Sequence, residues 1–311
     1  LGLLGLTRLT VVPTISRALL AGVLVALAVL CRPTFLVWGA AIAVAILLTP
    51  QSPFRRRLWL AAAFVLALGV VAAPWAVRNA LVFQRPIVTT THGGYTLWLG
   101  NNEEFYRFLD QADWGDAWDS RRLDEQYLRV RREFQYDELQ ADRWAYEQSL
   151  ATIRRHPASF VRACVSRLGS LWGLVPHRVE ASESALKRLA RYAVGAWYTA
   201  VTGLALLGAG SLRRKLFAQP WLGGLLLCLS FTLMHTVYWS YMRMRAPLMP
   251  VVCLAAAVGA LKVGDPLDPE TNVGPVVSRR RYTSLYPRLM PGGSEPATNG
   301  TNCTNGIIGG L

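Results

Sequence analysis

The placement of acidic residues constrains this chain more than any other feature of its sequence. No Asp or Glu precedes Glu103, and none lies between Glu183 and Asp265. Both stretches consist mainly of Leu, Ala and Val, and 52% of the 311 residues are hydrophobic. A soluble protein of this length needs a polar surface, whereas a lipid bilayer favours long apolar stretches without acids. We therefore expect a mostly α-helical, polytopic membrane protein.

The apolar stretches predict six membrane spans. Crossing about 30 Å of hydrocarbon takes about 20 mostly apolar residues in a helix, because lipid cannot satisfy open backbone groups. The candidate spans are residues 17–31, 34–48, 58–77, 192–210, 220–239 and 246–261. They divide the chain into membrane helices (1–78), a water-facing region (79–190), further membrane helices (191–262) and a tail (263–311). Because the first residue is Leu1 rather than Met, and no charged, signal-like segment precedes the first apolar stretch, we expect the chain to be a fragment of a longer protein.

Clusters of basic residues predict the orientation. Residues 55–57 lie between the second and third spans, and residues 213–215 lie between the fourth and fifth. Loops rich in Lys and Arg stay in the cytoplasm, so the region 79–190 should be extracytoplasmic and the tail cytoplasmic. The tail is rich in Gly, Pro, Asn, Thr and Ser, a composition typical of disorder. The net charge of +14 follows this topology, and we exclude nucleic acid as a partner.

The water-facing region has the composition of a small soluble subdomain, with most of the acids of the chain nearly balanced by arginines. Residues 124–153 predict a helix. The residues that are loosely spaced for its one buried face are Leu128, Phe134, Leu139, Trp144, Leu150 and Ile153. Residues 159–174 predict an amphipathic helix at the membrane interface, with Arg162 and Arg167 on its polar side.

Four arginines are not explained by the orientation rule, because they lie at the outer ends of spans. They are Arg32, Arg78, Arg243 and Arg245. Arginine binds phosphate with two parallel hydrogen bonds, so a cluster at this depth predicts a site for a lipid phosphate. The alternative is that each side chain only reaches toward the headgroups of the bilayer.

The start of the water-facing region predicts a sugar or acceptor site. It combines glycines, aromatic rings and amides at His92, Gly93, Gly94, Tyr95, Trp98, Asn101 and Asn102. Aromatic rings stack on pyranoses and amides bond to hydroxyl groups, although the same residues could cap a compact loop. His92 could act as a base, but a lone histidine is more often structural.

No motif predicts a metal or a cofactor. The five cysteines form no CxxC pair, and three of them (Cys31, Cys228 and Cys253) lie within apolar stretches. Neither a zinc site nor a set of disulfides is expected.

Four motifs give the chain a resemblance to a known family. They are Leu-Cys-Arg-Pro-Thr at 30–34, Pro-Trp-Ala-Val-Arg-Asn at 74–79, Leu-Trp-Leu-Gly-Asn-Asn at 97–102 and the Arg-x-Arg-x-Pro turn within 241–250. In order and spacing they resemble bacterial membrane glycosyltransferases related to dolichyl-phosphate-mannose protein mannosyltransferases and lipid A aminoarabinose transferases, which have the GT-C fold. The resemblance covers residues 17–261.

This resemblance implies an enzyme of the bacterial inner membrane that transfers a sugar from a polyprenyl-phosphate donor to an acceptor at the outer face. The arginines would hold the leaving phosphate, and membrane lipids would surround the spans. The general base of such enzymes is an Asp or Glu in the first outer loop, which would lie upstream of Leu1, so the fragment alone should be inactive. Metal dependence varies within the family, so the resemblance leaves a divalent metal open.

Other interpretations remain. Residues 262–275 are similar to a short stretch of aldehyde dehydrogenases, without the nucleotide-binding glycines or nucleophilic cysteine of that family, and we interpret this stretch as a joining artefact. A lipid-linked oligosaccharide flippase or polymerase would also use outer arginines, but it should carry polar residues at mid-membrane. A non-catalytic membrane scaffold is the third alternative.

Overall fold

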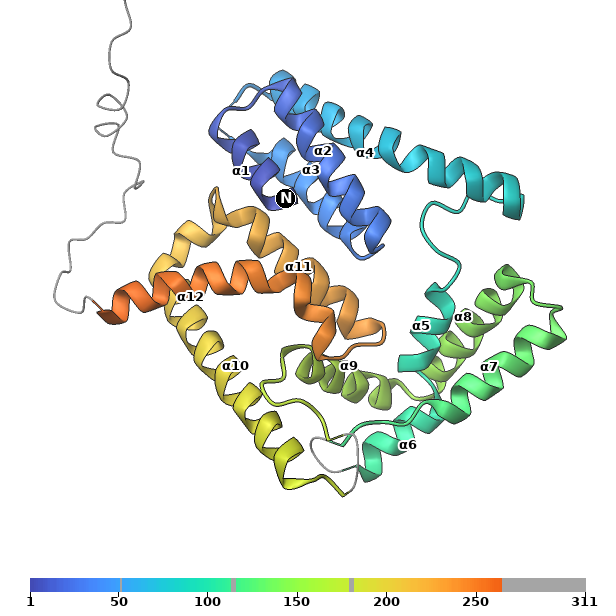
Figure 1. Ribbon diagram of the computed structural model, residues 1–311. Coiled ribbons are helices and arrows are strands. Elements are labelled where there is room, and N and C mark those ends of the chain that lie inside the picture. Colours follow the sequence, from blue (N-terminus) through green and yellow to red (C-terminus); the bar gives the residue numbers. More distant parts are fainter. Residues whose placement is uncertain (51, 113–115, 179–181, 265–311) are drawn as a thin grey trace, which may run out of the picture. The chain divides into compact units, whose positions relative to one another are not determined.

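The computed structural model describes residues 1–50, 52–112, 116–178 and 182–264, and this part of the chain is helical without a named strand (Figure 1). The predicted tail and its dehydrogenase-like stretch from residue 265 onward lie outside the described residues. The helices are α1 (Gly2–Val11), α2 (Ile15–Cys31), α3 (Phe35–Leu48), α4 (Phe54–Phe83), α5 (Gly93–Gly100), α6 (Glu103–Gln111), α7 (Arg121–Glu133), α8 (Glu138–Arg155), α9 (Pro157–Trp172), α10 (Ala185–Leu212), α11 (Trp221–Val237) and α12 (Met249–Gly264). Two 3-10 segments, η1 (Arg213–Phe217) and η2 (Met242–Leu248), precede α11 and α12.

Three helical segments are long and apolar enough to cross a membrane. They are α4, α10 continued by η1, and η2 continued by α12, with 30, 33 and 23 residues. The predicted spans 58–77, 192–210 and 246–261 fall within them. The other three predicted spans correspond to α2, α3 and α11, which are apolar helices of 17, 14 and 17 residues.

The long helices expose much apolar surface. Only 11% of the most apolar window of α10 is buried, and Leu206 and Leu207 on this helix are exposed. Water would penalise such a surface, whereas hydrocarbon would not. The exposed apolar faces therefore agree with helices that could cross a bilayer.

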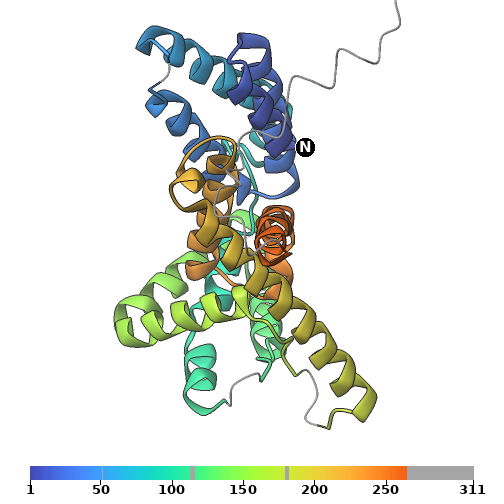
Figure 2. The same ribbon diagram turned by 90° about the vertical axis from the view of Figure 1, so that its left-hand side faces the viewer.

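The N-terminal helices, blue in Figures 1 and 2, pack around α2. Gly22 lets α2 approach α4, because a Cβ at this position would lie 2.3 Å from the carbonyl oxygen of Phe64. Trp38 is buried, and its Nε1 donates to the Gly223 carbonyl at 2.9 Å, which joins α3 to α11. Since α3 returns the chain, α2 and α4 run in the same direction and end on the same side.

Glycines also bring α10 and α12 together near the end of α10 (Figure 1). A Cβ at Gly208 would meet the Ala255 carbonyl oxygen at 1.9 Å, and one at Gly259 would meet the Leu204 carbonyl oxygen at 2.0 Å. Small residues allow such close backbone approach, which is the usual basis of helix packing in lipid.

The prediction of a single helix over residues 124–153 is wrong. The segment covers most of two helices, α7 and α8, which are separate because Gln135 and Tyr136 adopt positive φ angles of 51° and 63°. Asp137 then caps α8 by accepting hydrogen bonds from the backbone N–H groups of Leu139 and Gln140. The expected buried face also differs, since Leu128 and Leu150 are exposed.

The predicted interfacial helix at 159–174 is present as α9, but its polar side is not as expected. Val161 and Val165 are exposed, whereas Arg167 is only 1% exposed. Arg162 is half exposed and pairs with Asp110, as a surface arginine does. The prediction that Arg167 lies on an exposed polar side is therefore wrong. Its guanidinium is buried because carbonyls of distant segments, at Gly100 and Thr236, accept its hydrogen bonds.

Candidate functional site

A cavity of about 480 Å³ lies where α2 and α4 end. Its apolar lining consists of Val29, Leu30, Pro33, Trp75, Phe83 and Val88. Its polar lining consists of Arg78, Asn79, Thr89, Thr90, Thr91 and Glu138, and Cys31 completes it. The motifs at 30–34 and 74–79 thus contribute to one cavity, because α2 and α4 end on the same side.

Arg78 is the cation of this cavity. Its guanidinium lies over the rings of Trp75 and Phe83, 5.3 and 5.8 Å from their centroids, and Nη1 donates to Oδ1 of Asn79 at 3.0 Å. The side chain is exposed and forms no ion pair in the described part of the chain. The remaining guanidinium donors are therefore open to an anion.

Asn79 was not predicted, and it fixes the wall of the cavity. It is buried, and its Nδ2 donates to the Ile87 carbonyl at 3.0 Å. Trp75 similarly donates from Nε1 to the Thr89 carbonyl at 2.9 Å. The last turns of α4 thus hold the segment 87–91 across the mouth of the cavity.

Arg32 lies at the C-cap of α2, between two residues that line the cavity. Its Nη2 contacts Sδ of Met244 at 3.2 Å, so the end of α2 touches η2. Arg32 is not among the lining residues, but no carboxylate of the described chain pairs with it.

The two arginines of η2 differ from each other. Arg243 is exposed, and it donates from Nη2 to the hydroxyl of Tyr241 at 2.8 Å while lying over the same ring. Arg245 is buried, and its Nη1 donates to the carbonyls of Leu171 and Gly173 at 3.3 and 2.6 Å. Nε and Nη2 of Arg245 have no hydrogen-bond partner in the described part of the chain. The structure thus brings Arg32 next to η2 and places Arg78 in the cavity beside the α2 motif.

The predicted sugar loop is a helix, α5, whose glycines serve close packing against α8. A Cβ at Gly93 would lie 2.2 Å from the hydroxyl of Tyr146, and one at Gly94 would lie 2.1 Å from the Asp142 carbonyl. The Gly94 N–H donates to Oδ1 of Asp142 at 2.7 Å. Burial raises the pKa of Asp142, against the effect of these backbone donors.

Trp98 near the end of α5 is buried, and so are Asn101 and Asn102, which follow this helix. None of the three lines one of the described cavities. Trp98 packs on Trp144 with 5.0 Å between ring centroids. Asn101 donates to the carbonyls of Leu97 and Val237, and Asn102 caps α6 by accepting from the Phe105 N–H at 2.8 Å. These contacts agree with the alternative that the residues cap a compact segment, since both side-chain amides form hydrogen bonds within the fold.

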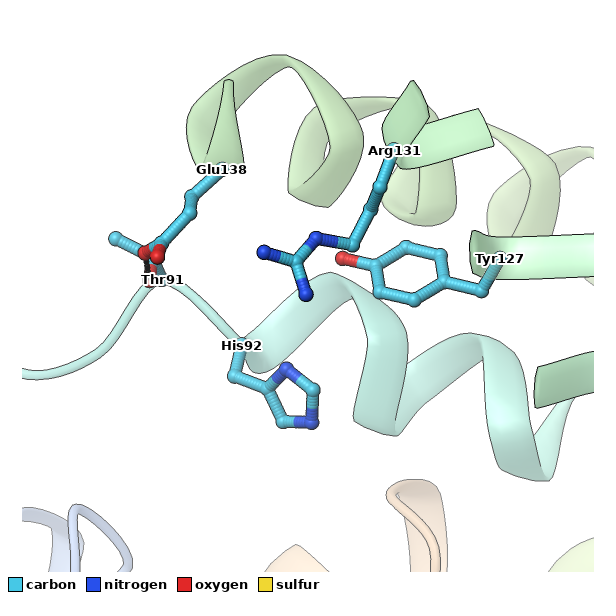
Figure 3. A pocket seen from close by; sticks show the side chains of 5 residues that line it. All are labelled: Thr91, His92, Tyr127, Arg131 and Glu138. Atoms are coloured by element: carbon cyan, nitrogen blue, oxygen red, sulfur yellow. Dashed lines mark hydrogen bonds between the residues drawn. The ribbon is translucent and has the colours of Figure 1, made fainter. Parts of the chain in front are cut away.

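His92 and Tyr95 remain at an accessible site. A second pocket, of about 120 Å³, is lined by Thr91, His92, Tyr127, Arg131 and Glu138 (Figure 3). Tyr95 does not line this pocket, but it contacts two residues that do. Its ring centroid lies 4.7 Å from that of His92 and 4.5 Å from that of Tyr127. Tyr95 donates to Asp124, and burial with this contact raises its pKa.

The residues that sequence reasoning missed come from the helices that close this region. Tyr127 and Arg131 lie one turn apart on α7, and Glu138 begins α8. The run of three threonines at 89–91 was the available signal for Thr91, because consecutive hydroxyls before a helix are unusual in an apolar chain. Nothing in the sequence places α7 against residue 91.

A third cavity, of about 490 Å³, contrasts with the first. It lies between α3 and the segment from Phe217 to Leu226, and none of its lining residues is charged. Such a lining suits hydrocarbon rather than phosphate. The described residues also contain no group of three or more His, Cys, Asp and Glu side chains that could hold a metal ion.

No protein-family model, curated protein or solved structure matches this chain. The resemblance to GT-C glycosyltransferases stays a prediction. The function is therefore argued from the residues of the site.

Proposed function

We propose that this chain is part of a polytopic membrane glycosyltransferase that takes a sugar from a polyprenyl-phosphate donor at the extracytoplasmic face of a bacterial inner membrane. The observation that carries the proposal is the two-sided lining of the 480 Å³ cavity. A polyprenyl-phosphate sugar has an apolar chain, a phosphate and a set of hydroxyl groups. The cavity offers apolar side chains, one unpaired arginine and a row of threonines. Its volume also falls within the range usual for small-molecule sites.

The charges at the two ends of the N-terminal helices support the proposed orientation. Arg17, Arg56 and Arg57 all lie near the beginnings of α2 and α4. Their guanidinium groups donate to backbone carbonyls of Arg8, Pro13 and Leu47, which lie at that same end. The cavity lies at the other end of both helices, which is the outer end if the basic cluster is cytoplasmic.

The chemistry assigned to Arg78 is stabilisation of the leaving group. When an acceptor hydroxyl attacks the anomeric carbon, the bond from that carbon to the phosphate oxygen breaks and polyprenyl phosphate leaves with one additional negative charge. A guanidinium in place before the reaction stabilises that charge without reorganisation. The acceptor proton passes to a carboxylate, which in the resembled family lies in the first outer loop.

Transfer of labelled sugar from a polyprenyl-phosphate donor, measured in membranes that carry the full-length protein, tests this proposal. We expect Arg78→Ala to lower the transfer rate by about 100-fold, the usual scale for loss of one preorganised charge-stabilising donor. Arg78→Lys should recover only part of the rate, because an ammonium group lacks the paired geometry of guanidinium.

Arg154→Ala is the matched control, since Arg154 is an exposed arginine on α8 that forms no ion pair with any described residue. It should transfer sugar at the wild-type rate. Equal rates for wild type and Arg78→Ala at equal protein levels would sink the proposed site. Labelled lipid that crosses the membrane without sugar transfer would favour a flippase.

A further inference from the structure

The small pocket beside the Arg78 cavity is built from three separate segments of the water-facing region. Thr91 and His92 precede α5, Tyr127 and Arg131 come from α7, and Glu138 begins α8. Thr91 and Glu138 line both this pocket and the larger cavity. The two spaces are therefore neighbours with a shared wall.

The pocket places an acceptor opposite a donor with room between them. Oε2 of Glu138 accepts from the Thr91 hydroxyl at 2.8 Å. The Glu138 carboxylate forms no ion pair with the described residues. The Arg131 side chain lies over the ring of Tyr136, 5.8 Å from its centroid, and it forms no hydrogen bond or ion pair in the described part of the chain. Figure 3 shows its guanidinium lying between Tyr127 and the Thr91–Glu138 pair. A ligand hydroxyl can donate to Glu138 while another oxygen accepts from Arg131.

The size of the pocket restricts the ligand. A volume of about 120 Å³ corresponds to about four water molecules, at about 30 Å³ each in the liquid. That room suits the hydroxyl edge of one sugar unit rather than a lipid chain. The carboxylate beside Arg131 also disfavours a free anion, which would meet a like charge.

The floor of the pocket is held in place before any ligand arrives. The rings of His92, Tyr95 and Tyr127 follow one another at 4.7 and 4.5 Å between centroids, and Tyr95 is fixed by its hydrogen bond to Asp124. The rings of His92 and Tyr127, which line the pocket, are thus both in contact with the ring of Tyr95. Burial raises the pKa of Tyr127, so its hydroxyl stays protonated and can donate.

From these contacts we propose that the pocket of Thr91, His92, Tyr127, Arg131 and Glu138 binds the hydroxyl edge of an uncharged sugar, with Glu138 and Arg131 as its specificity-determining groups. Binding itself does not depend on the proposed transferase activity. Only the source of the sugar, donor or acceptor, rests on that proposed function.

The test is saturation-transfer NMR with the full chain in lipid nanodiscs and a panel of uncharged methyl glycosides. We expect at least one glycoside to bind wild type, and Glu138→Gln and Arg131→Met each to weaken it by about tenfold or more, as loss of a hydrogen bond to a charged group does. Glu147→Gln on α8 and Arg132→Met on α7 are the matched controls, because both residues are exposed and neither forms an ion pair within the described part of the chain. These controls should bind as wild type does, and equal melting temperatures exclude misfolding.

Two outcomes would overturn the assignment. One is that no glycoside of the panel binds wild type, and the other is that Glu138→Gln and Arg131→Met bind as wild type does. Displacement of the glycoside by inorganic phosphate alone would also count against it, because the pocket would then be an anion site.

A final arm identifies the source of the sugar. If a polyprenyl-phosphate sugar displaces the glycoside from wild type, the pocket holds the sugar of the donor. If both bind together, it holds a sugar of the acceptor. Arg78→Ala should keep glycoside binding in either case, which separates failure of this proposal from failure of the proposed transferase.

Discussion

Arg167 in α9 and Arg245 in η2 are 1% and 4% exposed, yet they use their guanidinium groups differently. Every nitrogen of Arg167 has an acceptor: Nε donates to the Thr236 carbonyl at 2.7 Å, Nη1 to the Gly100 carbonyl, and Nη2 to Sγ of Cys164 at 3.3 Å. Arg245 uses only Nη1, and its Nε and Nη2 remain without a partner in the described chain.

The difference separates a structural arginine from one that is available to a ligand. Arg167 joins α9 to the ends of α5 and α11, so its charge is spread over fixed carbonyl dipoles. Arg245 is anchored by the end of α9 and lies 4.2 Å from the ring centroid of Tyr198, but it keeps two buried donors. Buried donors without partners are unfavourable, and they are retained where a ligand, ion or water completes them.

The largest effect should come from Arg167→Met. It leaves the carbonyls of Thr236 and Gly100 without their donor, and each unsatisfied group costs about 1–3 kcal/mol. We expect the free energy of unfolding to fall by roughly 3–5 kcal/mol. Denaturant unfolding in micelles measures this.

Arg162→Met on the same helix is the control for that variant. Arg162 forms a half-exposed ion pair with Asp110, so its loss should cost below about 1 kcal/mol. Equal losses for the two variants would mean that burial of Arg167 contributes nothing.

A smaller loss of stability is expected for Arg245→Met, about 1 kcal/mol or less. The lost bonds to Leu171 and Gly173 are offset by removal of two unsatisfied donors. The decisive measurement is the rise in melting temperature when polyprenyl phosphate is added, since a ligand stabilises only the state that binds it. Wild type should show the rise and Arg245→Met a smaller one, because Arg78 remains in its cavity. An equal rise in both would show that the free donors of Arg245 do not bind phosphate.

The smallest effect concerns Asp142, a half-buried acid whose oxygen accepts from backbone N–H groups, much as two nitrogens of Arg167 donate to carbonyls. Its pKa is raised from 3.8, so the folded state holds the proton more tightly than the unfolded state. Stability from this group is therefore present at low pH and lost as pH rises from about 4 through the folded pKa. Asp142→Asn should remove this fall and change stability at pH 7 by below about 1 kcal/mol.

Unfolding of wild type and Asp142→Asn between pH 4 and 7 checks this sign. A wild-type stability that rises over this range relative to the variant would contradict it.

Much of the helical framework could be predicted from the sequence. The six apolar stretches correspond to α2, α3, α4, α10, α11 and the η2–α12 segment, and Pro157 begins a helix where α8 ends. Hydrophobicity is a local property, so each apolar run can be recognised without its neighbours. The same local logic placed Arg78 at the end of a span, although α4 continues beyond it to Phe83.

The candidate site was only partly predictable. Gly93 and Gly94 suggested contact with a ligand, but their partners are Tyr146 and Asp142 of α8, about 50 residues away. Two left-handed residues, Gln135 and Tyr136, divided a predicted helix, and neither is a glycine that would have marked the turn. Nothing in the local sequence distinguishes Arg131 and Glu138 from ordinary surface charges, because they meet in one pocket only when α7 and α8 are folded.

Residue type and local spacing are enough to predict that the chain is helical, apolar in long stretches and basic at particular loop positions. Which arginine has all its donors bonded and which keeps free donors depends instead on the tertiary structure. Whether a guanidinium finds carbonyl partners depends on distant backbone, such as Thr236 and Gly100 for Arg167, and no local pattern around an arginine encodes those contacts.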